Sequence, residues 1–484
     1  MLKFWYFLVI IALIAIVGDI RAQAPQIEWD CFYGEVNMNE YARGAHSTPD
    51  GGYVAGGNTQ REGSLDCLIV KFNSEGDTVW TRSTGSMTHH ETIQAFYVLP
   101  DGKYLSAGAI NEYGDIKSHI MIMAPNGDHE FSGYYNSDHD NSVAFDVALN
   151  LDSGFVFVSA VENDGDDNND VSLTRLHPLG APQWEYSYDM AHEQIPYSVV
   201  PMMGGGYFVV GESQDFVNFR DQGMIYITNS CGVPEIITVH DSNGRVVYTD
   251  VQQLPDSGFV ITGLITDDLF DTADLLVKRL NADLSEAWTK TYGFGGDDVA
   301  ECVEPTADGG FIVGGTCEVG TLNYWALRLD ANGDTLWTKI TGTPRYDYLR
   351  SISITDDGGY IMCGESVEQD NPYRYDMYVV KLEPDQVGID DTHSQLSSQL
   401  VLSQNYPNPF NASTTIEFRL LSKQHVNLGV YDILGREITT LLDETRKAGT
   451  HAVSFDAGSL PSGIYFYKIL ADNYTRTRRM LLIK

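Results

Sequence analysis

The chain has 484 residues, enough for several domains or for one large ring with an appendage. Its 30 basic and 67 acidic residues give a formal net charge of -37, and 43% of its residues are hydrophobic. This charge argues against a protein that binds nucleic acid by neutralising phosphates, and against docking on anionic membranes. We therefore expect a well-packed, strongly acidic protein with no nucleic-acid partner.

Residues 1–24 are predicted to be a secretory signal peptide. Lys3 supplies positive charge, and the unbroken apolar run from Phe4 to Val17 is too short to span a bilayer comfortably. The small residues Ala22 and Ala24 offer cleavage sites. No later segment is long and apolar enough to cross a membrane, so we expect an exported protein without a transmembrane segment.

A short phrase that ends in an aromatic residue occurs seven times. Its aromatic residues follow one another at intervals of 51, 51, 52, 52, 52 and 49 residues. Such a regular period predicts repeated supersecondary units. The copies are Asp50-Gly51-Gly52-Tyr53, Asp101-Gly102-Lys103-Tyr104, Asp152-Ser153-Gly154-Phe155, Gly204-Gly205-Gly206-Tyr207, Asp256-Ser257-Gly258-Phe259, Asp308-Gly309-Gly310-Phe311 and Asp357-Gly358-Gly359-Tyr360.

Each copy contains four strand-like segments. An alternating stretch precedes the turn, and β-rich segments such as Phe311 to Gly315 and Leu275 to Leu280 follow it. A fourth segment, such as Leu336 to Lys339, carries a tryptophan, which the fourth copy lacks. Four short strands in about 50 residues are typical of a β-propeller blade, with an open solenoid as the alternative.

The two ends of the repeat array favour a ring. The seventh copy ends at Leu382 without a tryptophan segment, whereas residues 26–34 carry Trp29 five residues before Gly34. The same interval separates Trp80 from Gly85. We therefore predict a seven-bladed β-propeller over residues 25–383, in which the strand with Trp29 completes blade seven and closes the ring.

The repeats resemble an extracellular bacterial propeller family. That family is built on a D-G-G-Y-I-V-x-G phrase and a later L-x-K-L-x-x-x-G-x-x-x-W phrase, and the resemblance covers roughly residues 26–383. It implies an architecture more than an activity, because propellers include both enzymes and binding proteins.

Residues 384–400 lose the repeat and are predicted to be a linker. Beyond them, Ile416, Phe418 and Leu420 alternate with polar residues, which indicates β-strands. Residues 401–484 hold 10 basic and 7 acidic residues, so this segment is net positive, unlike the rest. We predict that they form a small Ig-like β-sandwich, which makes the whole chain all-β.

Residues 401–484 resemble the C-terminal sorting domain, type A, of the type IX (Por) secretion system. The resemblance implies passage through the periplasm, recognition by an outer-membrane translocon and removal by sortase-like processing machinery. The cargo would then be secreted or held on the outer cell surface. Without this resemblance the segment would be an Ig-like accessory or carbohydrate-binding module. The motif residues are Asn405, Tyr406, Pro407, Asn408, Pro409, Phe410, Gly435, Pro461, Gly463, Tyr465 and Lys484.

One acidic loop could hold calcium, the only cofactor that the sequence suggests. Its oxygen-bearing side chains occupy alternate positions, as in a calcium loop. However, Asn169 and Arg175 stand where such a loop has glycine and glutamate, so a solvated acidic loop is the alternative. The candidate ligands are Asp164, Asp166, Asn168 and Asp170.

Two cysteines flank one of the turns nearly symmetrically. Cys302 and Cys317 lie on either side of residues 308–310, so they could form a disulfide across a hairpin. The alternative is that both are small buried hydrophobic residues.

No catalytic residue can be assigned from the sequence. The pair His90-Glu91 lacks the second histidine of H-E-x-x-H, and no G-x-S-x-G is present. We favour a monomeric binding or adhesion protein with an unknown extracellular glycan or protein ligand. The alternative is an extracellular hydrolase or lyase that acts on polysaccharide through carboxylates at the mouth of the propeller tunnel.

Overall fold

The fold is described from a computed structural model of the chain. The structure describes residues 23–482. The predicted signal peptide and most of the predicted linker lie outside the described residues. The gaps are 36–37, 62–63, 86–88, 137–138, 140, 151, 163–167, 189–192, 216–219, 241–243, 267–271, 368–370, 372–373, 386–399, 403–404, 406–409, 421–422, 432–435, 448, 459 and 472–473.

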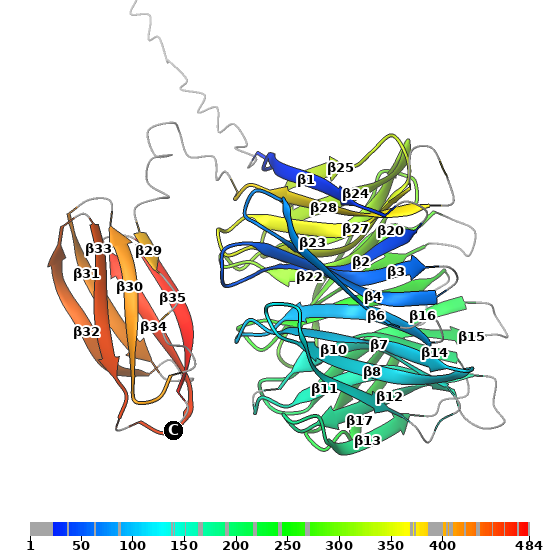
Figure 1. Ribbon diagram of the computed structural model, residues 1–484, viewed down its shortest axis with the longest axis horizontal. Helices are drawn as coiled ribbons and strands as arrows, with labels where there is room; N and C mark the ends of the chain where they lie inside the picture. Colours follow the sequence, from blue (N-terminus) through cyan, green and yellow to red (C-terminus); the bar gives the residue numbers. More distant parts are fainter. Residues whose placement is uncertain are drawn as a thin grey trace, which may run out of the picture. The chain divides into compact units, whose positions relative to one another are not determined.

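The chain divides into two compact units, Met1–Gln386 and Val387–Lys484. The described residues of both units form strands and turns but no α-helix (Figure 1). The expected all-β class is therefore confirmed.

The strands of the first unit form seven groups of four antiparallel strands, which we number as blades 1 to 7. Blades 2 and 3 join into one eight-stranded sheet through a single parallel pair, Asn141 with Ile116. Blade 1 is β2 (Asn39–Ser47), β3 (Tyr53–Arg61), β4 (Ser64–Phe72) and β5 (Thr78–Thr84); blade 2 is β6 (His89–Val98), β7 (Tyr104–Glu112), β8 (Asp115–Met123) and β9 (His129–Tyr135). Blade 3 is β10 (Asn141–Leu149), β11 (Phe155–Glu162), β12 (Asn169–Leu176) and β13 (Pro182–Tyr188); blade 4 is β14 (Glu193–Pro201), β15 (Tyr207–Asp215), β16 (Arg220–Thr228) and β17 (Pro234–His240).

The remaining blades continue the same pattern, except that blade 7 takes its fourth strand from the N-terminus. The propeller class is confirmed, whereas the count of seven blades in one closed ring stays a proposal. Blade 5 is β18 (Val246–Gln253), β19 (Phe259–Ile265), β20 (Asp274–Leu280) and β21 (Glu286–Tyr292); blade 6 is β22 (Val299–Pro305), β23 (Phe311–Val319), β24 (Thr321–Leu329) and β25 (Thr335–Thr341). Blade 7 is β26 (Asp347–Ile354), β27 (Tyr360–Val367), β28 (Tyr375–Leu382) and β1 (Ile27–Tyr33).

The repeated phrase forms the turn between the first two strands of each blade. Its second residue has a positive φ in every copy, including Ser153 and Ser257, which are not glycine. In six copies the aspartate that begins the phrase accepts a hydrogen bond from the backbone N–H two residues later, as Asp50 does from Gly52 at 3.2 Å. The phrase thus fixes a tight turn by its own side chain.

In five blades the same aspartate also pairs with a basic residue at the end of the third strand. The basic side chain is buried or half-buried and the aspartate is exposed, so the pair anchors the turn to the sheet. Blade 4 has neither partner, since Gly204 and Ile227 stand at these positions. The pairs are Lys71–Asp50, Arg175–Asp152, Arg279–Asp256, Arg328–Asp308 and Lys381–Asp357.

Tryptophans of the fourth strands pack between neighbouring blades. Each indole contacts the turn aromatic of the next blade, with ring centroids 5.4 to 6.2 Å apart. Aromatic rings in these geometries stabilise an interface beyond their area burial. The contacts are Trp29–Tyr53, Trp80–Tyr104, Trp184–Tyr207, Trp288–Phe311 and Trp337–Tyr360.

Strand β1 joins the two ends of the repeat array. It pairs antiparallel with β28, where Trp29 lies opposite Lys381. Lys381 is fully buried, and its Nζ lies 3.1 Å from Glu28 Oε2. Trp29 is half-buried and donates from Nε1 to the Ser74 carbonyl of blade 1 at 3.1 Å. These contacts support our proposal that β1 closes the ring.

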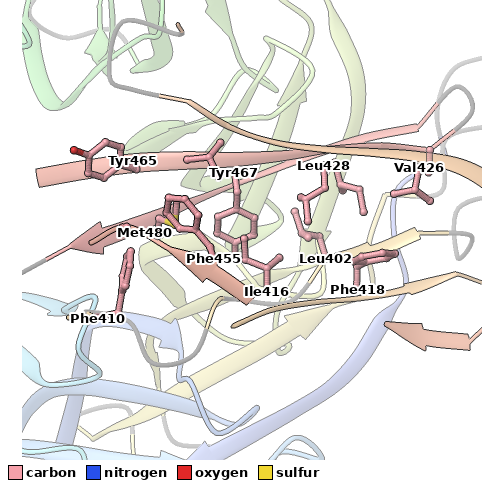
Figure 2. Packing of buried hydrophobic residues seen from close by; sticks show 14 of the residues in the cluster. Leu402, Phe410, Ile416, Phe418, Val426, Leu428, Phe455, Tyr465, Tyr467 and Met480 are labelled. Atoms are coloured by element: carbon pink, nitrogen blue, oxygen red, sulfur yellow. The ribbon is translucent and has the colours of Figure 1, made fainter. Parts of the chain in front are cut away.

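The second unit is a sandwich of two sheets, with strand orders β29-β30-β33 and β32-β31-β34-β35. Its core lies between them and includes Phe410, Phe455 and Tyr467 (Figure 2). Ile416, Phe418 and Leu420 are buried while Thr415 is exposed, which confirms the predicted alternation. Its Ig-like classification stays a prediction. The strands are β29 (Leu400–Leu402), β30 (Ser413–Leu420), β31 (Gln424–Tyr431), β32 (Glu437–Arg446), β33 (Gly449–Asp456), β34 (Gly463–Ala471) and β35 (Tyr474–Leu482).

Replacing the closing tryptophan tests the role of β1. Because Trp29 is half-buried, Trp29→Ala should lower the free energy of unfolding by about 2 kcal/mol, less than the roughly 3–5 kcal/mol lost at a fully buried aromatic site. The control Val79→Ala, at a side chain that is 58% exposed, should change it by at most about 0.5 kcal/mol.

Deleting residues 26–34 should have a larger effect, because β28 then becomes an unpaired edge that can aggregate. Denaturant titration and light scattering measure the two effects. A deletion variant that stays monomeric and melts like the parent would contradict closure by this strand.

Candidate functional site

Each blade has a β-bulge in its first strand, at the same position. The pairing of the first and second strands skips one residue there, for example Arg43 between Ala42 and Gly44. Each skipped residue lies ten residues before the turn aromatic, as Arg43 does before Tyr53. Bulges of this kind re-aim a side chain. The seven bulged residues are Arg43, Gln94, Phe145, Tyr197, Thr249, Glu301 and Arg350.

The seven bulged side chains line one cavity of about 140 Å³. First strands of all seven blades contribute to its wall, so we call it the axial cavity. All seven side chains are half-buried. They include aromatic, acidic, basic and neutral polar types, whereas the residue just before each of them is apolar or aromatic in every blade. The bulged position therefore changes its chemistry from blade to blade.

A circle of hydrogen bonds links the first strands of neighbouring blades around this cavity. Each bond joins one blade to the next, and the last returns from blade 7 to blade 1. Such a circle holds the first strands in fixed register around the cavity. In blade order, the contacts are His46 Nε2 to Phe96 O at 2.7 Å, Tyr97 Oη to Asp146 Oδ1 at 2.7 Å, Val199 N to Asp146 Oδ2 at 2.9 Å, Ser198 Oγ to Asp250 Oδ1 at 2.9 Å, Val303 N to Asp250 Oδ2 at 2.9 Å, Ile354 N to Glu304 Oε2 at 2.9 Å, and Ser353 Oγ to His46 Nδ1 at 3.1 Å.

His46 takes part in this circle as a neutral imidazole. Its Nε2 donates to the Phe96 carbonyl, which can only accept, and in the neutral ring Nδ1 then accepts from the Ser353 hydroxyl. Burial lowers the pKa of His46, which agrees with the neutral form.

Burial also shifts the carboxyl groups of the circle. It raises the pKa of Asp250 and of Glu304 to about 7, against the opposing effect of backbone N–H donors. The pKa of Asp146 is raised for the same reason. Each of these carboxyls accepts backbone hydrogen bonds, so we assign them a positioning role.

One side of the axial cavity carries two arginines in different environments. Arg350 is held by carboxylates, with Nη2 2.6 Å from Glu365 Oε1 and Nη1 3.3 Å from Glu301 Oε1. Arg43 Nε is buried and has no hydrogen-bond partner among the described residues. Burial and the nearby Arg350 guanidinium lower the pKa of Arg43. Arg43 therefore presents a donor that an incoming oxygen acceptor could satisfy.

The sequence analysis did not identify the seven bulged residues, because they share no chemical type. The available signal was positional. A constant offset of ten residues from the turn aromatic, at a point where the alternation of the first strand breaks, would have marked all seven.

The disulfide that the sequence left open between Cys302 and Cys317 is not formed, since both cysteines are free. The hairpin register pairs Pro305 with Phe311 and therefore Cys302 with Gly314, three residues before Cys317. Three residues along a strand span about 10 Å, which exceeds the roughly 7 Å limit for a disulfide. The sequence spacing misled because the cysteines are not equally far from the turn: Cys302 lies three residues before Pro305, whereas Cys317 lies six residues after its partner Phe311.

The calcium candidates fall partly on the gap at residues 163–167. Asp164 and Asp166 lie outside the described residues, Asn168 lies in a bend, and Asp170 is buried in β12 opposite Val161. No group of three metal-ligating side chains occurs in the described part of the chain. Calcium binding by this loop stays a prediction.

The described residues of the sorting motif have structural roles in the second unit. Asn405 is buried, with Nδ2 2.9 Å from Thr414 Oγ1, and Phe410 packs in the core. The Tyr465 hydroxyl donates to the Pro461 carbonyl at 2.9 Å, and Gly463 begins β34. Tyr406, Pro407, Asn408, Pro409, Gly435 and Lys484 lie outside the described residues.

Comparison with protein families identifies this second unit. A family described as the secretion system C-terminal sorting domain matches residues 404–484. These residues are a type IX sorting domain. The chain is therefore secreted to the cell surface or the extracellular space, and its sorting domain implies the type IX secretion machinery as a partner. Within the described residues, no helix is long and apolar enough to cross a membrane.

Comparison with solved structures gives distant similarities. PorZ of Porphyromonas gingivalis, a surface component of its type IX secretion system, is 12% identical with a TM-score of 0.32, covering 92% of this chain and 52% of PorZ. The chain thus spans about half the length of PorZ. The β-propeller domain of the Trilobed protease from Pyrococcus furiosus is 11% identical with a TM-score of 0.43, covering 71% of this chain and 93% of that one. No curated protein matches the chain.

The raised pKa of Asp250 makes stability depend on pH. Because its folded-state pKa of about 7 lies above the ordinary value of 3.8, its contribution is fully present below about pH 4 and is lost as the pH rises through 7. In Asp250→Asn the free energy of unfolding should therefore fall less steeply between pH 4 and 7. The slope against pH should decrease by at most the contribution of one bound proton. Denaturant titrations across this range measure it. The control Glu75→Gln, at an exposed turn residue, should keep the parental slope, and a parental slope in Asp250→Asn would contradict the assignment.

Removing the sorting domain should block export without unfolding the first unit, because the two units have separate cores. A chain that ends at residue 400 should accumulate in the periplasm, and protease accessibility of whole cells against lysed cells measures this. Arrival of the truncated chain at the cell surface would contradict the role of the sorting domain.

Proposed function

We propose that this secreted propeller protein is a binding or adhesion protein whose ligand, an extracellular glycan or protein, contacts the axial cavity. One observation carries the proposal: the seven bulged positions combine a fixed backbone position with side chains of six different types. Binding sites are concave, with a few polar groups among apolar and aromatic ones.

The environment of Arg43 supports this proposal. A buried donor without a partner lowers the stability of the free protein by about 1–3 kcal/mol. A ligand oxygen that accepts a hydrogen bond from Arg43 removes this penalty. Binding therefore gains the free energy that the unpaired donor costs the free protein. Phe145 and Tyr197, whose ring centroids lie 5.8 Å apart, add an aromatic wall to the same cavity.

The carboxyls of the circle favour binding over catalysis. Asp146 and Asp250 use both carboxyl oxygens to accept hydrogen bonds from the protein itself, so their role in the fold already occupies them. A polysaccharide hydrolase or lyase is the second candidate, because Glu301 and Glu365 converge on one guanidinium, that of Arg350. In that case Glu301→Gln should abolish turnover and leave ligand binding intact.

The other partners follow from the export route. We propose that the outer-membrane translocon recognises the sorting domain and that sortase-like processing machinery removes it. The propeller then acts as a monomer at the cell surface or in the medium.

Arg43→Met tests the binding proposal. It should weaken binding at least tenfold for ligands found on glycan and peptide arrays, because it removes the free donor and retains the length of the side chain. Since Arg43 makes no hydrogen bond within the described residues, the melting temperature should stay the same or rise. The control Arg82→Met, at an exposed residue of β5, should leave both unchanged. Equal binding by the parent and Arg43→Met would contradict a role for the axial cavity.

A further inference from the structure

The interface between blades 4 and 5 differs from the other interfaces of this propeller. In blades 3 and 5 the fourth strand carries a tryptophan and, four residues later, a tyrosine. The tyrosine hydroxyl donates to the carbonyl of a turn glycine in the next blade, from Tyr188 to Gly232 at 2.6 Å and from Tyr292 to Gly333 at 2.6 Å. Blade 4 has Ile236 and His240 at these two positions.

The turn opposite Ile236 has changed as well. In five other blades the corresponding turn residue is a glycine, and an aromatic ring of the preceding blade lies over it. A Cβ atom at any of these glycines would collide with that ring. Blade 5 has Leu284 there, with a φ of 66°. A leucine in the left-handed region is uncommon, and backbone strain of this kind concentrates at binding and switch sites. The five glycines are Gly76, Gly127, Gly180, Gly232 and Gly333.

The changes leave a groove of about 290 Å³ between the two blades. Its wall is mainly apolar, and Ile227, which stands where five other blades have a basic residue, forms part of it. A cavity of about 150 Å³ lined by apolar side chains is large enough to bind benzene. The polar rim consists of the Lys278–Glu286 ion pair and of His240, whose Nδ1 lies 3.0 Å from the Tyr248 hydroxyl. The apolar lining residues are Phe208, Ile225, Ile227, Ile236, Leu280 and Leu284.

We propose that this groove, which we call the blade 4–5 groove, is a binding site for one planar aromatic ring of indole or phenol size. The other interfaces of the same protein indicate the occupant, because there an aromatic ring of the protein fills the space between a fourth strand and the turn of the next blade. Among the described residues of blades 4 and 5, none supplies such a ring between the fourth strand and the next turn, and Ile236 is 40% exposed at the opening. The ring comes from a free aromatic compound or from an aromatic side chain of a peptide.

Titration of the full chain with indole, followed by calorimetry and by thermal melting, tests the proposal. Indole should bind at a single site and raise the melting temperature. Ile236→Trp should weaken indole binding at least tenfold, because its own ring then occupies the groove. His240→Tyr should weaken it as well, and provides a second variant if Ile236→Trp does not fold.

Ile237→Trp is the matched control, because Ile237 is the next residue of β17 and its side chain faces away from the groove. It should bind indole as the parent does. N-acetyl-tryptophanamide distinguishes the two sources: binding shows that the groove accepts a peptide-borne ring, and its absence alongside indole binding restricts the site to free aromatic compounds. Absence of saturable indole binding, unchanged binding by Ile236→Trp, or equal binding of N-acetyl-leucinamide would each overturn the proposal. The axial cavity shares no residue with this groove, so the two proposals stand or fail separately.

Discussion

The pairing of β1 with β28 is the contact on which the first unit depends. A sheet edge with unpaired N–H and C=O groups is prone to aggregate, and a linear array of blades has such an edge at each end of the chain. In this protein the N-terminal strand covers the edge of β28, and the buried Lys381 binds Glu28 of β1 and Asp357 of its own blade. Trp29 extends the same strand onto blade 1 through Tyr53.

The repeats separate a constant frame from a variable surface. Turns, ion pairs and interblade tryptophans recur because they hold the backbone of each blade in the same geometry. The bulge in each first strand releases one side chain per blade from the alternation of the sheet and directs it to the axial cavity. Substitutions at that position leave the frame intact, because the bulged residue has no partner in the ladder. Function can therefore diverge at the bulges while the propeller persists.

Much of the fold could be predicted from the sequence, because the signal was periodic. The turn phrase, the apolar alternation of the strands and the sorting motif each depend on local residue order, and the propeller class and the sorting domain followed from them. The axial cavity could not be predicted, because it brings together side chains from different blades, such as Arg43 and Glu301, that lie far apart in the sequence. The disulfide between Cys302 and Cys317 does not form because the hairpin turns about a different centre than the spacing suggested, which leaves Cys302 opposite Gly314.

The same repeats also show where comparison within one chain is informative. In the sequence, blade 4 was noted only for its missing tryptophan, which blade 2 also lacks. In the structure, its replacements Ile227, Ile236 and His240 all face one groove, together with Leu284 of blade 5. Changes that are scattered along the sequence therefore form a single site, and a position-by-position comparison of blades detects it without any homologue.

The seam between β1 and β28 has a consequence for the kinetics of folding. Ile27 pairs with Leu382, a separation of 382 - 27 = 355 residues, whereas the other contacts within each blade are local. The length-dependent entropy of closing such a loop is about 5 kcal/mol, and β1 is synthesised long before its partner exists. The blades with only local pairings can form first, and blade 7 must form last. A chain whose blades form in sequence order therefore stays open until β1 docks on β28.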